Sequence, residues 1–169
     1  YASMPDAVYV ADERKCLVLD SASGAIRHSF EVAVDQPPAV PVSASDIRVG
    51  DDTILIALRF NNENGIEKGR WNSELLVALD RATGEQLWSR PATLRYNTAA
   101  IAVSGGRVFC IDSHSPAEIG FMSRRGEDVS TLPSTILALD ARSGRELWKT
   151  VRADPPATLT SLHFMSLRT

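Results

Sequence analysis

The segment ALDRATGEQLW at residues 78–88 returns sixty positions later as ALDARSGRELW at residues 138–148. A weaker third copy, VLDSASGAIRH, occupies residues 18–28. The aspartates and glycines keep the same interval in all three copies; they are Asp20, Asp80, Asp140, Gly24, Gly84 and Gly144. A fixed period of this length indicates a repeat architecture, in which each unit is one supersecondary element.

Each copy is preceded by short apolar runs that predict β strands. The clearest runs are TILIAL (53–58), LLVAL (75–79) and TILAL (135–139), which are rich in Leu, Ile and Val and too short for helices. Their apolar residues do not alternate with polar ones. Strands of this kind are covered on both faces, so we expect each sheet to lie between two neighbours.

The D-x-x-[ST]-G segment predicts a tight turn. The Asp side chain accepts hydrogen bonds from backbone N–H groups two or three residues ahead, and the Gly supplies a left-handed backbone. The chain then continues in a second strand, EQLWSR or RELWKT. We therefore expect one partial domain over residues 1–169, with repeats at 1–36, 37–90 and 91–154 and a further blade beginning at 155–169. Stacked, repeated antiparallel sheets are typical of a β-propeller.

The pattern A-x-D-x-x-[ST]-G-x-x-x-W resembles the tryptophan-docking motif of the quinoprotein-type (PQQ-like) eight-bladed β-propellers. The resemblance implies an all-β fold, a partial ring of about three four-stranded antiparallel blades. It also implies that each tryptophan lies against the neighbouring blade. The first copy departs from the motif, with Val18 for Ala and His28 for Trp. The positions that match are Ala78, Asp80, Thr83, Gly84, Trp88, Ala138, Asp140, Ser143, Gly144 and Trp148.

Three blades cannot close a ring and leave two apolar terminal faces, which are association surfaces. We therefore expect the chain to be a segment of a longer propeller, or to complete its ring with another protein chain. The 18 Lys and Arg residues are interspersed among 21 Asp and Glu residues, which argues against nucleic-acid binding. No apolar run reaches the roughly 20 residues of a transmembrane helix, and no signal peptide is visible. The resemblance implies a periplasmic or otherwise exported protein.

Quinone-dependent enzymes of the family hold pyrroloquinoline quinone (PQQ) on the propeller axis with calcium, a catalytic Asp and often a vicinal disulfide. None of these features can be assigned to a residue of this sequence. Cys16 and Cys110 lie in separate apolar runs, where we expect small buried side chains. We predict no catalytic residue, no metal ligand and no cofactor for this chain, and PQQ with calcium only in a longer parent.

Two insertions between apolar runs, at 61–73 and 112–134, are candidate binding loops, because such loops on a rigid scaffold often carry function. Their candidate contact residues are Arg70, Trp71, Phe121, Arg124 and Arg125. These residues either bind a peptide, a glycan or a neighbouring domain, or belong to solvated loops whose aromatic side chains pack on their own blade.

Two functions of different classes follow. The first is a non-catalytic scaffold or binding module, a PQQ-like repeat propeller of the cell envelope. The alternative is a fragment of a PQQ-dependent alcohol or sugar dehydrogenase, or a sensor domain of a larger multidomain protein. The repeat decides the fold and leaves this choice open, because function depends on a site.

Overall fold

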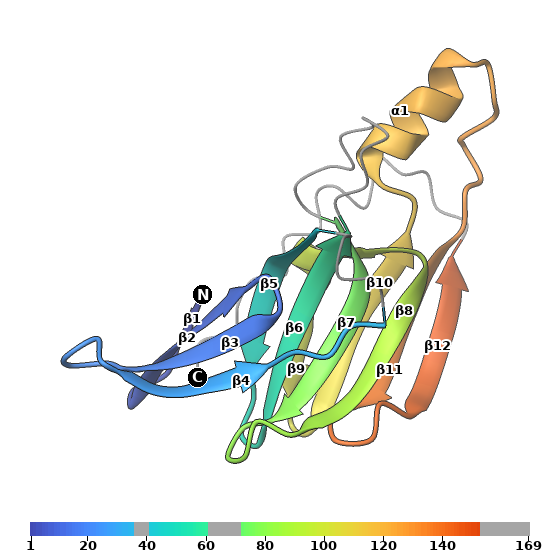
Figure 1. Ribbon diagram of the computed structural model, residues 1–169. Coiled ribbons are helices and arrows are strands. Elements are labelled where there is room, and N and C mark those ends of the chain that lie inside the picture. The colour runs from blue at the N-terminus through green and yellow to red at the C-terminus, as the bar shows by residue number, and fades with distance from the viewer. Residues whose placement is uncertain (36–40, 61–71, 153–169) are drawn as a thin grey trace.

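The computed structural model describes residues 1–35, 41–60 and 72–152 of the chain (Figure 1). These residues form antiparallel β strands, one 3-10 turn at Thr98–Ala100 and one α helix. The all-β class predicted from the sequence is confirmed. No helix within these ranges has the length and apolar character needed to cross a bilayer.

The first sheet has the strand order β1-β2-β3-β4. Its strands are β1 (Ala2–Ser3), β2 (Ala7–Asp12), β3 (Lys15–Asp20) and β4 (Ile26–Glu31). The second group of four strands follows the same up-and-down order. It consists of β5 (Val42–Val49), β6 (Thr53–Phe60), β7 (Asn72–Asp80) and β8 (Gln86–Asn97).

The third group pairs in the order β9-β10-β11-β12. Its strands are β9 (Ala102–Ser104), β10 (Arg107–Ser113), β11 (Ser134–Asp140) and β12 (Glu146–Arg152). Strand β8 is long and continues through Pro91 into the third group, where Tyr96 lies opposite Asp112 of β10. The second and third groups therefore form one continuous sheet path rather than two separate sheets.

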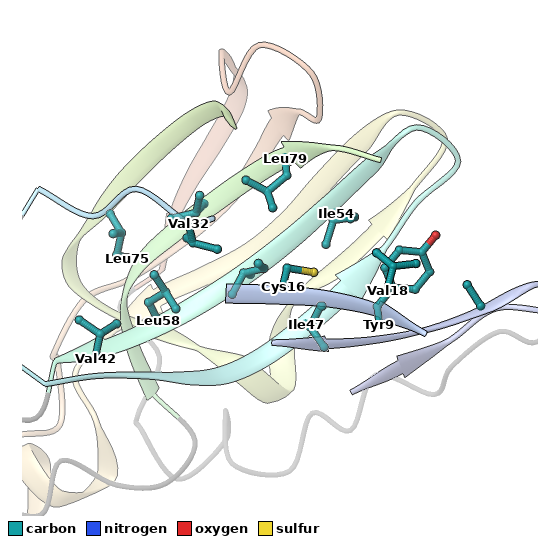
Figure 2. Packing of buried hydrophobic residues seen from close by; sticks show 13 residues of the cluster. Tyr9, Cys16, Val18, Val32, Val42, Ile47, Ile54, Leu58, Leu75 and Leu79 are labelled. Atoms are coloured by element: carbon teal, nitrogen blue, oxygen red, sulfur yellow. The ribbon is translucent and has the colours of Figure 1, made fainter. Parts of the chain in front are cut away.

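The middle group is buried on both faces, as its uninterrupted apolar strands predict. One face of β6 and β7 packs against the first sheet in a core that Figure 2 shows from close by. This core includes Cys16, Val18, Ile54, Val77 and Leu79. The opposite face of the same two strands packs against the third group; the buried residues there are Leu55, Ala57, Leu76, Ala78, Val108, Cys110, Leu137 and Leu139.

Each unit also carries the same irregularity, a β-bulge just before its turn. The strand register shifts between Val18 and Leu19, between Ala78 and Leu79, and at the equivalent place in β11. A bulge bends a strand and increases its twist. Because it recurs at one position, the bulge is part of the repeated unit.

Candidate functional site

The three D-x-x-[ST]-G turns have the geometry expected of their sequence. The Asp80 carboxylate accepts hydrogen bonds from the backbone N–H of Ala82 at 2.9 Å and of Thr83 at 3.0 Å. The Asp140 carboxylate accepts one from the Ser143 N–H at 2.8 Å. In both turns these backbone hydrogen bonds lower the pKa of the aspartate. The glycine backbones are left-handed, with φ values of 72° at Gly24, 75° at Gly84 and 68° at Gly144.

Trp88 connects the second unit to the third. Its indole Nε1–H donates a hydrogen bond of 2.8 Å to the carbonyl oxygen of Ala141, in the β11–β12 turn. The indole ring also covers Gly144, where a Cβ atom would stand only 2.7 Å from the ring. Ala78 lies opposite Trp88 on β7 and is fully buried. Glycine at 144 and alanine at 78 thus leave room for the ring.

The first unit makes its contact with a different residue. His28 stands at the tryptophan position and stacks on Phe30, with 5.7 Å between ring centroids. The ring of Phe30, and not that of His28, covers Gly84 of the next unit. Sequence reasoning missed Phe30, because the aromatic residue is displaced by two positions along β4. A displacement of two residues keeps the side chain on the same face of the strand. An aromatic residue at this position could therefore have indicated the contact from the sequence.

Trp148 makes no such contact with another unit among the described residues. Its side chain is 47% exposed and lies beside Phe109 of its own unit, with 6.2 Å between ring centroids. Ala138, opposite Trp148 on β11, is fully buried. The further blade expected from residue 155 lies outside the described residues.

The 112–134 insertion contains a helix, α1 (Pro116–Arg124), which Figure 1 shows beyond the upper end of the strands. The expectation of a plain loop was wrong here. Ser115 and Glu118 form a capping box, with a proline at the first helical position. The letters SPAE at 115–118 carry this signal, so the start of the helix was readable from the sequence.

A network of charges fixes α1 to the sheet. Arg95 of β8 bonds to Glu118 at 3.2 Å and also pairs with Glu74 of β7. Glu74 accepts a hydrogen bond of 2.6 Å from the backbone N–H of Phe60. Burial alone would raise the pKa of Glu118, but hydrogen bonds from Ser115 and the charge of Arg95 outweigh it and lower the pKa. Glu118 therefore stays ionised at neutral pH.

Three of the candidate contact residues lie on α1 or at its C-cap. No residue of α1 is buried, and Phe121 is 44% exposed. The guanidinium of Arg125 lies over the Phe121 ring, 5.4 Å from its centroid. Arg124 occupies the last position of the helix. The Phe121 ring is therefore partly exposed to solvent and in contact with Arg125. Arg70 and Trp71, the other candidates, lie outside the described residues.

The two cysteines are buried thiols in different cores. Burial raises the pKa of Cys16 to about 11 and that of Cys110 to about 12. Cys16 lies between the first two units and Cys110 between the second and third. Within the described ranges, no three His, Cys, Asp or Glu side chains gather in a way that could hold a metal ion.

Comparison with known proteins agrees with the repeat. The sequence model of a PQQ-like family, described as outer membrane protein assembly factor BamB, matches residues 69–168, more than half of the chain. The chain belongs to this family. No curated protein matches it.

Solved quinoprotein structures share the fold of this PQQ-like family member. A quinohemoprotein alcohol dehydrogenase from Comamonas testosteroni has a TM-score of 0.54 and 18% identity over 91% of this chain and 27% of that chain. A europium-containing methanol dehydrogenase has a TM-score of 0.51 and 17% identity, with 88% and 23% covered. The quinohemoprotein alcohol dehydrogenase ADHIIG from Pseudomonas putida HK5 has a TM-score of 0.53 and 15% identity, with 91% and 26% covered.

These likenesses confirm the predicted fold, a β-propeller segment. The chain spans about a quarter of the length of the three structures. At this level of identity the likeness concerns the fold alone.

Proposed function

We propose that this chain is a non-catalytic part of a PQQ-like repeat propeller that holds another protein chain in the cell envelope. The observation that carries this proposal is α1. The helix projects from the sheet with no buried residue, yet its N-terminal end is fixed by the Arg95 network. Exposed Phe121 and its partner Arg125 are thereby presented on a rigid base.

The chemistry of that surface suits a protein partner. Aromatic and arginine side chains dominate the binding energy of protein interfaces. A surface that is already ordered loses little conformational entropy when it binds. Phe121 supplies apolar area, and Arg124 and Arg125 supply donors for backbone carbonyls or carboxylates. A peptide segment of the partner fits this surface better than a glycan, because a peptide has apolar side chains to contact Phe121 and carbonyls or carboxylates to accept from the arginines.

The contacts between units suggest how the chain joins further blades. Trp88 and Phe30 each lie over the turn of the next unit along the chain. We infer that Trp148 does the same for a further blade, whose D-x-x-[ST]-G turn supplies a glycine and a free carbonyl. The docking motif then joins neighbouring blades of the ring, and α1 forms the binding surface of the propeller.

The family match supports the envelope location, because its description names an outer membrane protein assembly factor. A photo-crosslinking amino acid at position 121 of the full-length protein tests the proposal in its native host. We expect a discrete crosslinked protein product from position 121 and none from position 1, where Tyr1 is also aromatic and is 90% exposed but precedes β1 of the first unit. Absence of a product at 121, or the same product at both positions, would contradict the proposal.

A second candidate is a segment of a PQQ-dependent dehydrogenase, which the structural likeness to quinohemoprotein alcohol dehydrogenases favours. The full-length protein is incubated with PQQ and calcium and assayed for dye-linked alcohol or sugar oxidation. Quinone absorbance that stays with the protein, together with turnover, would establish this candidate and exclude a purely non-catalytic role.

A further inference from the structure

A groove of about 320 Å³ opens between β8, the last strand of the second unit, and β12, the last strand of the third. Its apolar lining includes Leu94 of β8, Leu137 of β11 and Val151 of β12. Leu137 is buried, whereas Val151 is 63% exposed although it lies in a strand. Clefts of this size that combine apolar walls with a few polar groups are typical of binding sites.

Strand β12 turns one face toward this groove. Lys149 and Val151 both line it, and they lie on the same face because they are two residues apart. Lys149 is paired with Leu137 of β11, whose side chain packs in the core between the second and third units. Trp148 lies on the opposite face of β12. The contact that we infer between Trp148 and a further blade therefore does not use the groove.

The charged residues of the groove leave one cation for a ligand. Glu146 bonds to Arg90 across the two units at 3.0 Å and lies 3.8 Å from the Lys149 ammonium. Lys149 donates no hydrogen bond within the described ranges, and its side chain is 59% exposed. Asp112 is buried, and its carboxylate accepts hydrogen bonds of 2.7 and 2.8 Å from two backbone N–H groups of β8. The Lys149 ammonium is therefore the charged group with donors to spare, and it favours a carboxylate.

The outer edge of β12 is unpaired in the described part of the chain. This strand is the last in its sheet and pairs with β11 alone (Figure 1). An edge strand presents a row of backbone N–H and C=O groups with which another strand can pair. A strand added there would lie directly beside Lys149 and Val151, and every second side chain of it would face the groove.

We propose that the groove between β8 and β12 binds an extended acidic peptide of a protein partner. The peptide pairs with the edge of β12 and places an apolar side chain against Leu94 and Val151. A carboxylate two residues further along the peptide contacts the Lys149 ammonium. Main-chain hydrogen bonds supply affinity in this arrangement, and the groove with Lys149 supplies selectivity. The site is formed by strands and does not depend on α1.

The probe is the fluorescein-labelled heptapeptide Thr-Thr-Val-Thr-Glu-Thr-Thr, titrated with the full-length protein and followed by fluorescence anisotropy. One control peptide has lysine in place of glutamate. A second control, Thr-Thr-Val-Glu-Thr-Thr-Thr, has the same composition but puts valine and glutamate on opposite faces of a strand. We expect the probe to bind at least about fivefold more tightly than either control.

Equal affinity for the probe and the lysine peptide would overturn the assignment of Lys149. Equal affinity for the probe and the rearranged peptide would overturn the strand geometry. No binding of the probe at millimolar concentration overturns the proposal as a whole. A groove that is covered by a second copy, or by another part of the protein, would give this last result.

A pair of charge reversals places the peptide in this groove. Lys149→Glu should invert the preference, so that the lysine peptide binds more tightly than the probe. Lys15→Glu is the matched control, because Lys15 is also 59% exposed and lies 3.7 Å from a glutamate, but in the first sheet. It should leave both affinities unchanged. An unchanged preference in a folded Lys149→Glu protein, or the same inversion in Lys15→Glu, means that the peptide binds elsewhere and refutes the assignment.

Discussion

Replacing Gly144 by alanine should destabilise the protein far more than the same change at Gly24. Both glycines have left-handed backbones, with φ values of 68° and 72°. An alanine at either position therefore has the same conformational cost of about 1–2 kcal/mol. A Cβ at position 24 meets no atom within 4 Å, whereas one at position 144 lies 2.7 Å from the Trp88 ring.

The additional cost at Gly144 comes from displacing that ring. Forcing extra volume into a packed contact costs about 1–3 kcal/mol, and losing the hydrogen bond to Ala141 costs about 1 kcal/mol more. We therefore expect Gly144→Ala to lower the free energy of unfolding by about 2–4 kcal/mol more than Gly24→Ala does. Urea unfolding, with the slope of the transition checked in each variant, measures the difference.

The cause is isolated by repeating both changes with Trp88→Ala. Without the indole, the two alanine substitutions should cost the same to within about 0.5 kcal/mol. If Gly144→Ala and Gly24→Ala cost the same in the parent protein, or if their difference survives without Trp88, the indole does not make the contact that joins the units.

Three further outcomes are expected. Burial raises the thiol pKa of Cys16 and of Cys110, so neither should react with a thiol reagent at pH 8 in the native protein, and both should react in denaturant. Rapid labelling of the native protein would contradict the burial of these thiols in the two cores. Backbone hydrogen bonds lower the pKa of Asp140, so its ionised carboxylate stabilises the fold above the ordinary aspartate pKa near 4. This stabilisation is lost as the pH falls below that value, so the difference in free energy of unfolding between the parent and Asp140→Asn should narrow between pH 5 and about pH 3. A difference that does not change with pH would argue against this charge effect. Phe30→Ala should lower the free energy of unfolding by about 1–3 kcal/mol and His28→Ala by less, as measured by thermal unfolding, because Phe30 covers Gly84. The opposite order would indicate that His28 makes the contact with the next unit.

Much of the fold follows from the repeat alone. Its apolar strands predicted sheets buried on both faces, and Leu55 and Ile56 indeed face different cores. The turn chemistry of Asp80 and Asp140 was also readable, because it depends only on local residues. These features are determined by contacts within one unit or by the shared period.

The features that were missed depend on interactions between units. Phe30 replaces the indole, although it stands two residues beyond the tryptophan position. An alignment of the three copies therefore pairs His28, and not Phe30, with Trp88. The pairing of Arg95 with Glu74 and Glu118 joins residues from two units and an insertion, so neither spacing nor periodicity indicates it. The start of α1 is different, because the local capping box of Ser115 and Glu118 indicates it.

The central claim is that an indole of one unit is held by the backbone of the next. Hydrogen exchange of the Trp88 indole N–H, followed by NMR in the folded protein, tests it most directly. Because this N–H donates to the Ala141 carbonyl at 2.8 Å, we predict exchange at least about tenfold slower than in the unfolded chain. Exchange of the Trp88 indole at the unfolded rate would contradict the account.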